Sequence, residues 1–128
     1  MSKEILYKDE SYKIMGACFE VYKAMGPGFL EAVYQECLAR EFTSQEVPFK
    51  QLHPLKLYYK NKPLNQAYQV DFLCYDKIII EIKSVRQIAD EHRAQTINYL
   101  RATDIQLGLL VNFGHHPKAE YERFVNQH

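Results

Sequence analysis

Hydrophobic residues in the first third of the chain recur at the spacing of an α-helix. Ile14, Cys18 and Val21 lie three or four residues apart, so they fall on one face of a helix. The segment 26–28, Gly-Pro-Gly, predicts the end of this helix, because glycine suits a left-handed cap and proline cannot continue a helix. A second helix is expected from about residue 29 to residue 42.

From Val47 onward the hydrophobic period changes to that of β-strands. Apolar and polar residues alternate, and Pro48 and Pro54 suggest edges or bends. The expected strands cover residues 47–52, 55–59, 67–74 and 77–84, with a turn at 61–63. Residues 86–102 are expected to form a helix, 106–112 a buried strand, and 120–125 either a short helix or a strand.

The expected elements follow one another in the order ααββββαβ and predict an α/β fold. A helix between the last two strands allows a parallel crossover, so the sheet should be mixed and flanked by helices. A chain of 128 residues is most simply one domain, covering residues 1–128.

Composition narrows the classes of protein to which this chain could belong. No apolar run reaches the roughly 18 residues that span a bilayer, and the first residues are too polar for a signal peptide, so no membrane contact and a cytoplasmic location are expected. Three dispersed cysteines without a CxxC pair are expected to be small buried hydrophobes.

Charge gives no general support for binding to nucleic acid. Sixteen Lys and Arg residues balance sixteen Asp and Glu residues, so no large overall attraction to phosphate is expected. A local basic groove remains possible, and an ordinary solvated charged surface is the simpler interpretation of the same residues. The candidates for such a groove are Lys56, Lys60, Lys62, Arg86, Arg93 and Arg101.

The candidate site residues are Asp71 and the charged residues of the segment Glu81-Ile82-Lys83. Side chains alternate along a strand, so Glu81 and Lys83 share one face while Ile82 points the other way. With Asp71 on the preceding strand, these residues match what a divalent metal ion and an activated water require. The alternative is an in-sheet salt bridge between Asp71 and Lys83, with Glu81 at the solvent edge.

The metal-site hypothesis depends on the register between these two strands. A two-residue turn at 76–77 would set Asp71 opposite Ile82 and therefore on the wrong face. A three-residue connection over 75–77, or a bulge, sets Asp71 opposite Glu81, because a slip of one residue reverses every side chain. The hypothesis therefore predicts an odd connection or a bulge at this point.

Two further segments carry polar residues at suggestive spacing. Gln95 and Tyr99 lie one turn apart on the predicted third helix, where Gln95 could bond a metal-bound water or a phosphate, and His92 lies on the same face. Glu31 lies in the first turn of the second helix, where the helix dipole favours a carboxylate. Taken alone, Gln95 with Tyr99 is typical of an ordinary amphipathic helix, and Glu31 is typical of a surface residue that the helix dipole favours.

Taken together, these residues resemble a known family. Asp71, Glu81-x-Lys83 and Gln95-x-x-x-Tyr99 are similar to the Asp, ExK and QxxxY motifs of RecB-type nucleases in the PD-(D/E)XK superfamily. The segment 28–34, Gly-x-x-Glu-x-x-Tyr, resembles the signature of the GxxExxY family of that superfamily. Val70 stands where the superfamily name has proline.

The resemblance implies a PD-(D/E)XK nuclease-like core and a phosphodiesterase site that uses Mg²⁺ or Mn²⁺. Asp71 and Glu81 would be the metal ligands, Lys83 the catalytic lysine and Glu31 the acidic residue of the first core helix. Gln95 would complete the catalytic set. Additional substrate contacts are expected at Tyr99, His92 and Arg86.

The function expected from these residues is hydrolysis of phosphodiester bonds in DNA or RNA. Two alternatives remain open. The same fold could bind nucleic acid or a protein partner without turnover, or it could form a structural or regulatory oligomer whose charged residues are held in salt bridges. A basic surface around Asp71 would favour nucleic acid, whereas an apolar patch of several hundred Å² would favour a protein interface.

Overall fold

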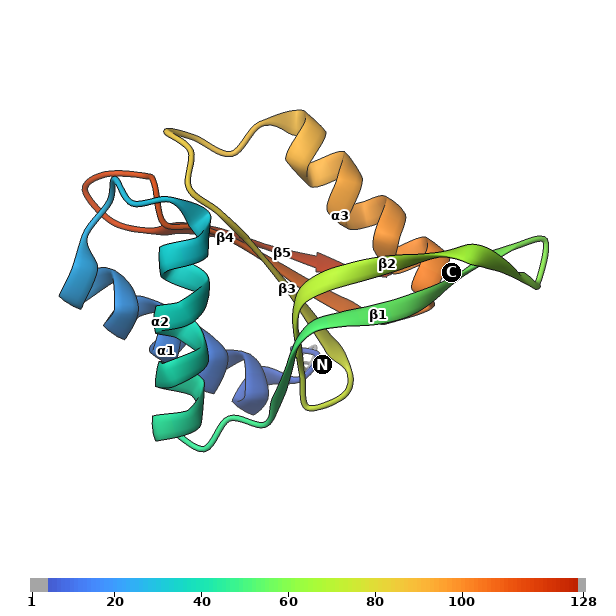
Figure 1. Cartoon of the computed structure of the whole chain (residues 1–128), viewed down its shortest axis with the longest axis horizontal. Coiled ribbons are helices and arrows are strands. Elements are labelled where there is room, and N and C mark those ends of the chain that lie inside the picture. Colours follow the sequence, from blue (N-terminus) through green and yellow to red (C-terminus); the bar gives the residue numbers. More distant parts are fainter. Residues whose placement is uncertain (1–4, 127–128) are drawn as a thin grey trace, which may run out of the picture.

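A computed structural model of the chain describes residues 5–126 and shows helices packed against one mixed sheet (Figure 1). None of the helices in this range is long and apolar enough to cross a membrane. The elements in chain order are α1 (Lys8–Met25), α2 (Glu31–Ser44), β1 (Phe49–Tyr59), β2 (Lys62–Cys74), β3 (Ile78–Lys83), α3 (Asp90–Thr103), β4 (Leu107–Asn112) and β5 (Glu120–Val125).

The five strands form one sheet in the order β1-β2-β3-β4-β5. Strands β3 and β4 are parallel and are joined through α3, while the other neighbouring pairs are antiparallel. The expectation of a mixed α/β sheet flanked by helices is therefore confirmed.

Alternation along β3 divides the interior into two layers. Ile78, Ile80 and Ile82 face the main core, which contains the buried residues of α1 and α2. Ile79 faces the other side, where Leu100 of α3 covers it. Glu81 and Lys83 share the parity of Ile79 and so belong to the side of the sheet that α3 covers (Figure 1).

The observed order of elements, ααβββαββ, differs from the expected ααββββαβ. The two strands expected over 47–52 and 55–59 are one strand, β1, which continues through Pro54. Because β1 lies at the edge of the sheet, it can accept a residue that lacks an N–H. The segment 120–125, for which the sequence allowed a helix or a strand, is β5.

Asn112 fixes the loop that follows β3. Its Oδ1 accepts the N–H groups of Val85 and Gly114, both at 3.0 Å, and its Nδ2 donates to the Val85 carbonyl at 2.8 Å. The same Nδ2 donates to Glu120 Oε1 at 2.8 Å, and this oxygen also accepts the Ile88 N–H at 2.7 Å. The end of β3, immediately after Lys83, is thus held by buried polar contacts from β4 and β5.

Gly114 allows this loop to approach closely. A Cβ atom at Gly114 would lie 2.4 Å from the Val85 carbonyl oxygen and 2.5 Å from the Val85 nitrogen, both of them backbone atoms. In contrast, a Cβ at Gly16, inside α1, would meet nothing within 4 Å.

We expect Gly114→Ala to destabilise the protein by about 1–3 kcal/mol, because the backbone at Val85 would have to move. Gly16→Ala is the matched control and should raise stability by about 0.5–1 kcal/mol, since alanine favours the interior of a helix. Chemical denaturation of both variants measures the difference. Equal stabilities for the two variants would contradict the close approach at Gly114.

Candidate functional site

The connection between β2 and β3 has the register that the metal-site hypothesis requires. Phe72 pairs with Ile80 and Cys74 pairs with Ile78, which leaves the three residues 75–77 as the connection. Continuing this register by one residue sets Asp71 opposite Glu81. The predicted odd connection is confirmed, and Asp71 and Glu81 therefore lie on the same face.

Asp71 stands where β2 separates from β3, and we call this point the fork. The β2–β3 ladder ends at the Phe72–Ile80 pair, and the β1–β2 ladder skips the position where Asp71 would face Leu52. Leu52 has a left-handed backbone, with φ of 51°. In place of a backbone partner, the Ile82 N–H donates to Asp71 Oδ2 at 2.9 Å.

In the hairpin formed by β1 and β2, alternate side chains of β2 also switch from one side of the sheet to the other at the fork. Phe72 belongs to the core under α1 and α2, whereas Val70 and Tyr68 pack toward α3. All three have the same parity, so a regular strand would place them on one side. The irregular backbone at Asp71 and Leu52 thus brings Tyr68 over the same side of the sheet as Glu81.

Glu81 is a buried carboxyl group whose neighbours oppose its ionisation. Its side chain is 8% exposed, and its Oε1 accepts a hydrogen bond from the Tyr68 hydroxyl. Burial, followed by the negative charge of Asp71, raises the pKa of Glu81 to about 8, against an ordinary value of 4.5, although the Tyr68 hydrogen bond and Lys83 act in the opposite direction. Two carboxyl groups brought together in this way are suited to share a cation.

Tyr68 links this carboxyl pair to α3. Its ring stacks on that of Tyr99, with centroids 3.4 Å apart and planes 10° apart. Burial and the charge of Glu81 raise the pKa of the Tyr68 hydroxyl, so it stays protonated and donates. Gln95 lies one turn before Tyr99, toward the start of α3; its side chain is exposed and has no partner among residues 5–126.

Lys83 ends β3 on the same face as Glu81. It is half-buried, and its positive charge lowers the pKa of Glu81. Within the described part of the chain, no salt bridge joins its ammonium group to Asp71 or to another carboxylate. The alternative of an in-sheet salt bridge with Glu81 at the solvent edge does not fit, because Glu81 is buried.

In the segment 28–34, some residues stabilise the fold, whereas Glu31 remains available to bind a ligand. Tyr34 is fully buried and stacks on Phe113, with ring centroids 4.7 Å apart. Its hydroxyl donates to the Gly26 carbonyl at 2.5 Å and accepts the Phe29 N–H at 3.2 Å, so it fixes the loop before α2. Gly28 has φ of 110°, a conformation that favours glycine.

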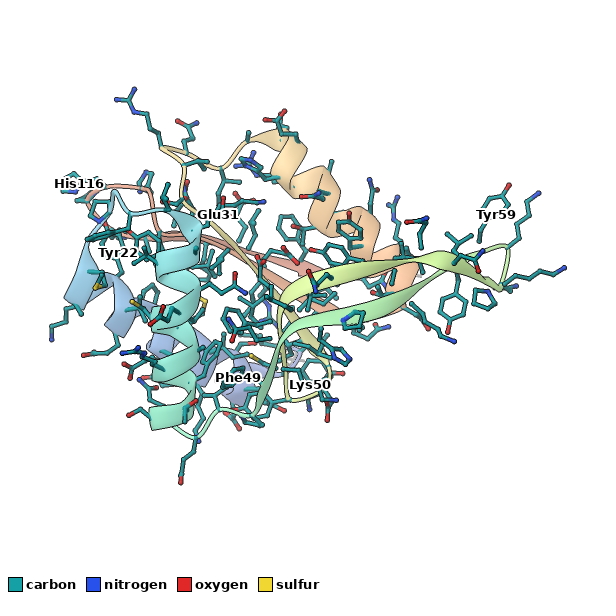
Figure 2. All side chains as sticks on the ribbon, in the orientation of Figure 1. Tyr22, Glu31, Phe49, Lys50, Tyr59 and His116 are labelled. Atoms are coloured by element: carbon teal, nitrogen blue, oxygen red, sulfur yellow. The ribbon has the colours of Figure 1, made fainter. Side chains whose placement is uncertain are left out.

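Glu31 is the charged residue of that segment and is exposed, at the first position of α2 (Figure 2). Its carboxylate has no hydrogen-bond or salt-bridge partner within residues 5–126. The Phe29 carbonyl accepts a hydrogen bond from Ser84, the residue after Lys83, so the start of α2 is attached to the end of β3.

Two of the expected substrate contacts lie around the loop before α3. His92 caps this helix, with Nδ1 accepting the Ala89 N–H at 3.0 Å. Arg86 is exposed in the loop between β3 and α3. Among residues 5–126, no three Asp, Glu, His or Cys side chains are close enough to hold one metal ion, so Glu31 does not join Asp71 and Glu81 as placed.

Gln35, which lies one turn after Glu31, was not among the residues predicted from the sequence. Its Nε2 is buried and has no hydrogen-bond acceptor within the described residues. Gln35 shares a face of α2 with Glu31 and Phe42, and Phe42 packs on Phe72 of β2, with ring centroids 5.3 Å apart. The spacing of four from Glu31 was the available signal, but an unpaired amide is visible only in three dimensions.

Two anchors place Gln35 at the level of the carboxyl pair. Phe42 lies beside Phe72, which pairs with Ile80, and the start of α2 is attached to Ser84. A rise of 1.5 Å per helical residue puts Gln35 about 10 Å from Phe42, which equals about three residues of strand. Gln35 therefore lies alongside the last residues of β3, on the side of the sheet that α1 and α2 cover.

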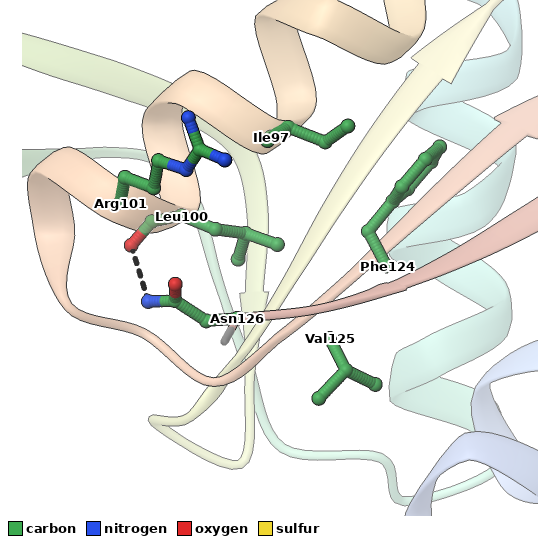
Figure 3. A pocket seen from close by; sticks show the side chains of 6 residues that line it. All are labelled: Ile97, Leu100, Arg101, Phe124, Val125 and Asn126. Atoms are coloured by element: carbon green, nitrogen blue, oxygen red, sulfur yellow. Dashed lines mark hydrogen bonds between the residues drawn. The ribbon is translucent and has the colours of Figure 1, made fainter. Parts of the chain in front are cut away.

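The cavity shown in Figure 3 is separate from this site. It lies between α3 and β5, lined by Ile97, Leu100, Arg101 and residues 124–126. Asn126 closes it by donating from Nδ2 to the Leu100 carbonyl at 2.9 Å. Its lining contains no carboxylate, so it offers no counterpart to Asp71 and Glu81.

Comparison with models of protein families shows to which family this chain belongs. The family model described as the PD-(D/E)XK nuclease superfamily matches residues 8–124, nearly the whole chain. The chain belongs to the PD-(D/E)XK nuclease superfamily. Val70, in place of the proline of the superfamily name, is fully buried in the cluster with Leu73, Ile79 and Leu100, so an apolar residue suits the position. A comparison with curated proteins found no match.

Solved structures agree with the superfamily at the level of the fold. The crystal structure of SSO0001 superposes with a TM-score of 0.59 at 15% identity, covering 77% of this chain and 50% of that one. The chain thus spans half the length of SSO0001. An alkaline exonuclease from Laribacter hongkongensis, LHK-Exo, superposes with a TM-score of 0.54 at 12% identity, covering 99% of this chain and 73% of that one.

We expect Glu81 to make stability depend on pH in the presence of a chelator. Its raised pKa means that the folded state keeps a proton that the unfolded chain loses above pH 4.5, so the free energy of unfolding should fall as pH rises from 4.5 to about 8. Glu81→Gln cannot ionise and should be more stable than wild type at pH 9, by roughly 1–3 kcal/mol. Denaturation at several pH values tests this, and identical pH profiles would contradict the raised pKa.

We expect Gln35→Met to stabilise the protein by roughly 1 kcal/mol, because it replaces a buried unpaired amide with an apolar side chain of similar size. Gln87→Met, in an exposed loop, is the control and should change stability by less than about 0.5 kcal/mol. Thermal denaturation compares the two variants. A loss of stability in Gln35→Met would show that the amide has a partner in the folded protein.

Proposed function

We propose that this protein is a divalent-metal-dependent nuclease that hydrolyses phosphodiester bonds of DNA or RNA. The observation that carries the proposal is the pair Asp71 and Glu81, placed on one face at the fork of a PD-(D/E)XK sheet. Their mutual repulsion and burial leave a site that a cation would stabilise. The name of LHK-Exo describes an exonuclease, in agreement with this class of activity.

The donor set fits Mg²⁺ or Mn²⁺, with Asp71 and Glu81 as the protein ligands. These hard ions prefer oxygen, and Mg²⁺ is usually held by one or two carboxylates together with water and substrate phosphate. A pair of carboxylates without a third Asp, Glu, His or Cys among residues 5–126 agrees with that pattern. When bound, the ion would lower the pKa of a water and neutralise charge on the phosphate.

The side chains around the pair have complementary roles in the proposed reaction. Lys83 has no carboxylate partner within the described residues, so its ammonium group is available to orient the attacking water and to stabilise charge on the phosphate. Tyr68 holds the Glu81 carboxyl group through its hydroxyl. The Asp71 carboxylate is oriented by the Ile82 N–H.

The start of α2 lies beside the end of β3, where Ser84 donates to the Phe29 carbonyl. Glu31 and Gln35 lie one turn apart on one face of α2, and neither side-chain head group has a partner among residues 5–126. We assign Glu31 to orienting the attacking water and the Gln35 amide to donating to a phosphate oxygen. Gln95 and Tyr99 would position the substrate from α3, with His92 and Arg86 at the rim.

We expect purified protein to cleave DNA or RNA with Mg²⁺ or Mn²⁺ and to lose at least about 100-fold of this activity on Asp71→Asn or Lys83→Gln. Asp71→Asn keeps an acceptor for the Ile82 N–H, so the loss would report charge and not folding. Asp76→Asn is the matched control, since Asp76 is an exposed carboxylate in the neighbouring turn. Cleavage of single- and double-stranded DNA and RNA is measured on gels.

Each outcome of this experiment decides between the candidate functions. Equal cleavage by wild type and both site variants would indicate contamination and reject the assigned site. Binding of nucleic acid without cleavage would favour the non-catalytic binding module. Absence of both would favour the protein-binding or oligomeric alternative.

A further inference from the structure

The β1–β2 hairpin extends beyond the fork as an arm, which we define as residues 53–70 (Figure 1). Most of its side chains are exposed, and Tyr59 lies near its tip, away from the helices (Figure 2). A two-stranded ribbon that is exposed in this way buries little apolar surface of its own. Its length is therefore unexplained by packing alone.

The arm concentrates positive charge in a chain that is neutral overall. It contains Lys56, Lys60 and Lys62 and no Asp, Glu or Arg, so the rest of the chain has three more acidic than basic side chains. The three lysines are exposed and form no salt bridge within residues 5–126. Although the net charge of the chain is zero, the arm is therefore a basic segment that a polyanion could contact.

Aromatic rings lie between these lysines. Tyr58 and Tyr59 are 48% and 63% exposed, and the Lys60 ammonium group lies 5.4 Å from the centre of the Tyr59 ring. Lys60 and Asn61 both have left-handed backbones, with φ of 49° and 65°, which makes the tight two-residue turn at the tip. Exposed rings interleaved with lysines are the composition of surfaces on which single-stranded bases stack.

A groove lies between the arm and the end of α3. It has a volume of about 700 Å³ and lies between Tyr58 and Asn61 of the arm and residues 101–104 at the end of α3. Its lining includes the exposed Arg101 together with one carboxylate, Asp104. Thr103 in this groove donates to the Tyr99 carbonyl at 2.6 Å, so the groove begins one turn from the Tyr68–Tyr99 stack beside Glu81.

We propose that the arm and the end of α3 bind a single-stranded segment of nucleic acid and lead it to the carboxyl pair at the fork. This inference rests on the proposed nuclease function. Lys56, Lys60, Lys62 and Arg101 contact phosphates, and Tyr58 and Tyr59 stack on bases. From Asp71 to Lys62 the strand spans up to about 30 Å, enough for several nucleotides.

The test measures binding of a short labelled oligonucleotide in EDTA, where cleavage cannot occur. We expect Lys56→Gln/Lys60→Gln/Lys62→Gln to bind single-stranded DNA about tenfold more weakly at low salt, and the slope of log K against log salt to fall in magnitude by about 2. The control, Lys13→Gln/Lys23→Gln/Lys118→Gln, removes three exposed lysines elsewhere and should bind within about twofold of wild type. All six lysines are exposed, so both variants should fold.

A double variant of the two tyrosines tests the stacking. Tyr58→Leu/Tyr59→Leu should weaken binding to single-stranded DNA by about fivefold or more and leave duplex binding nearly unchanged. Equal affinities for the arm and control lysine variants would overturn the proposal. A preference for duplex over single strand in the wild type would overturn the stacking assignment.

A small phosphodiester, bis(p-nitrophenyl) phosphate, separates this inference from the proposed function. It is too short to reach the arm, so the arm variants should hydrolyse it like wild type, whereas Lys83→Gln should not. If wild type hydrolyses this substrate but the arm variants bind the oligonucleotide as wild type does, only the proposed role of the arm is rejected. If binding depends on the arm but neither substrate is hydrolysed, the proposed nuclease function is rejected and the role of the arm in binding is retained.

Discussion

The repulsion between Asp71 and Glu81 is the constraint on which the rest of this structure depends. Two carboxyl groups in partial burial oppose folding unless a proton, a donor or a cation compensates them. The protein supplies the Ile82 N–H to one carboxylate and the Tyr68 hydroxyl to the other. These donors orient the pair but leave the pKa of Glu81 raised to about 8, so the compensation is incomplete. A carboxyl pair of this kind is suited to the divalent cation proposed for the site.

The same pair explains the irregular backbone of the hairpin. A regular ladder would pair Asp71 on both sides and would place Tyr68 on the side of Phe72, away from Glu81. The left-handed Leu52 and the end of the β2–β3 ladder release Asp71 and turn Tyr68 toward α3. Local irregularity at a site is consistent with a functional origin, because packing alone would favour continued pairing.

The sequence was sufficient for the features that depend on periodicity and neighbours. Alternation along β3 fixed the shared face of Glu81 and Lys83, and the odd connection over 75–77 followed from requiring Asp71 on that face. The continuation of β1 through Pro54 could not be predicted, because it depends on β1 being an edge strand, which is a property of the whole sheet. The roles of Gln35 and of the Asn112–Glu120 contact could not be predicted for a similar reason, since they depend on the three-dimensional surroundings of these residues. In the segment 28–34, the sequence could not show that Tyr34 is structural while Glu31 remains available.

Neutral net charge is weak evidence against binding to nucleic acid in a protein of this shape. Screening confines electrostatic attraction to roughly 8–10 Å at physiological salt, so a bound strand senses the nearest side chains and not the sum over the chain. The charged side chains nearest to a strand bound along the arm are lysines, and the excess of acidic residues lies in the rest of the molecule. The carboxyl pair at the base of the arm would itself repel phosphate unless a cation is present. Recognition and metal binding are therefore expected to be coupled, because a cation at the fork would neutralise the carboxylate charge at the end of the proposed path of the strand.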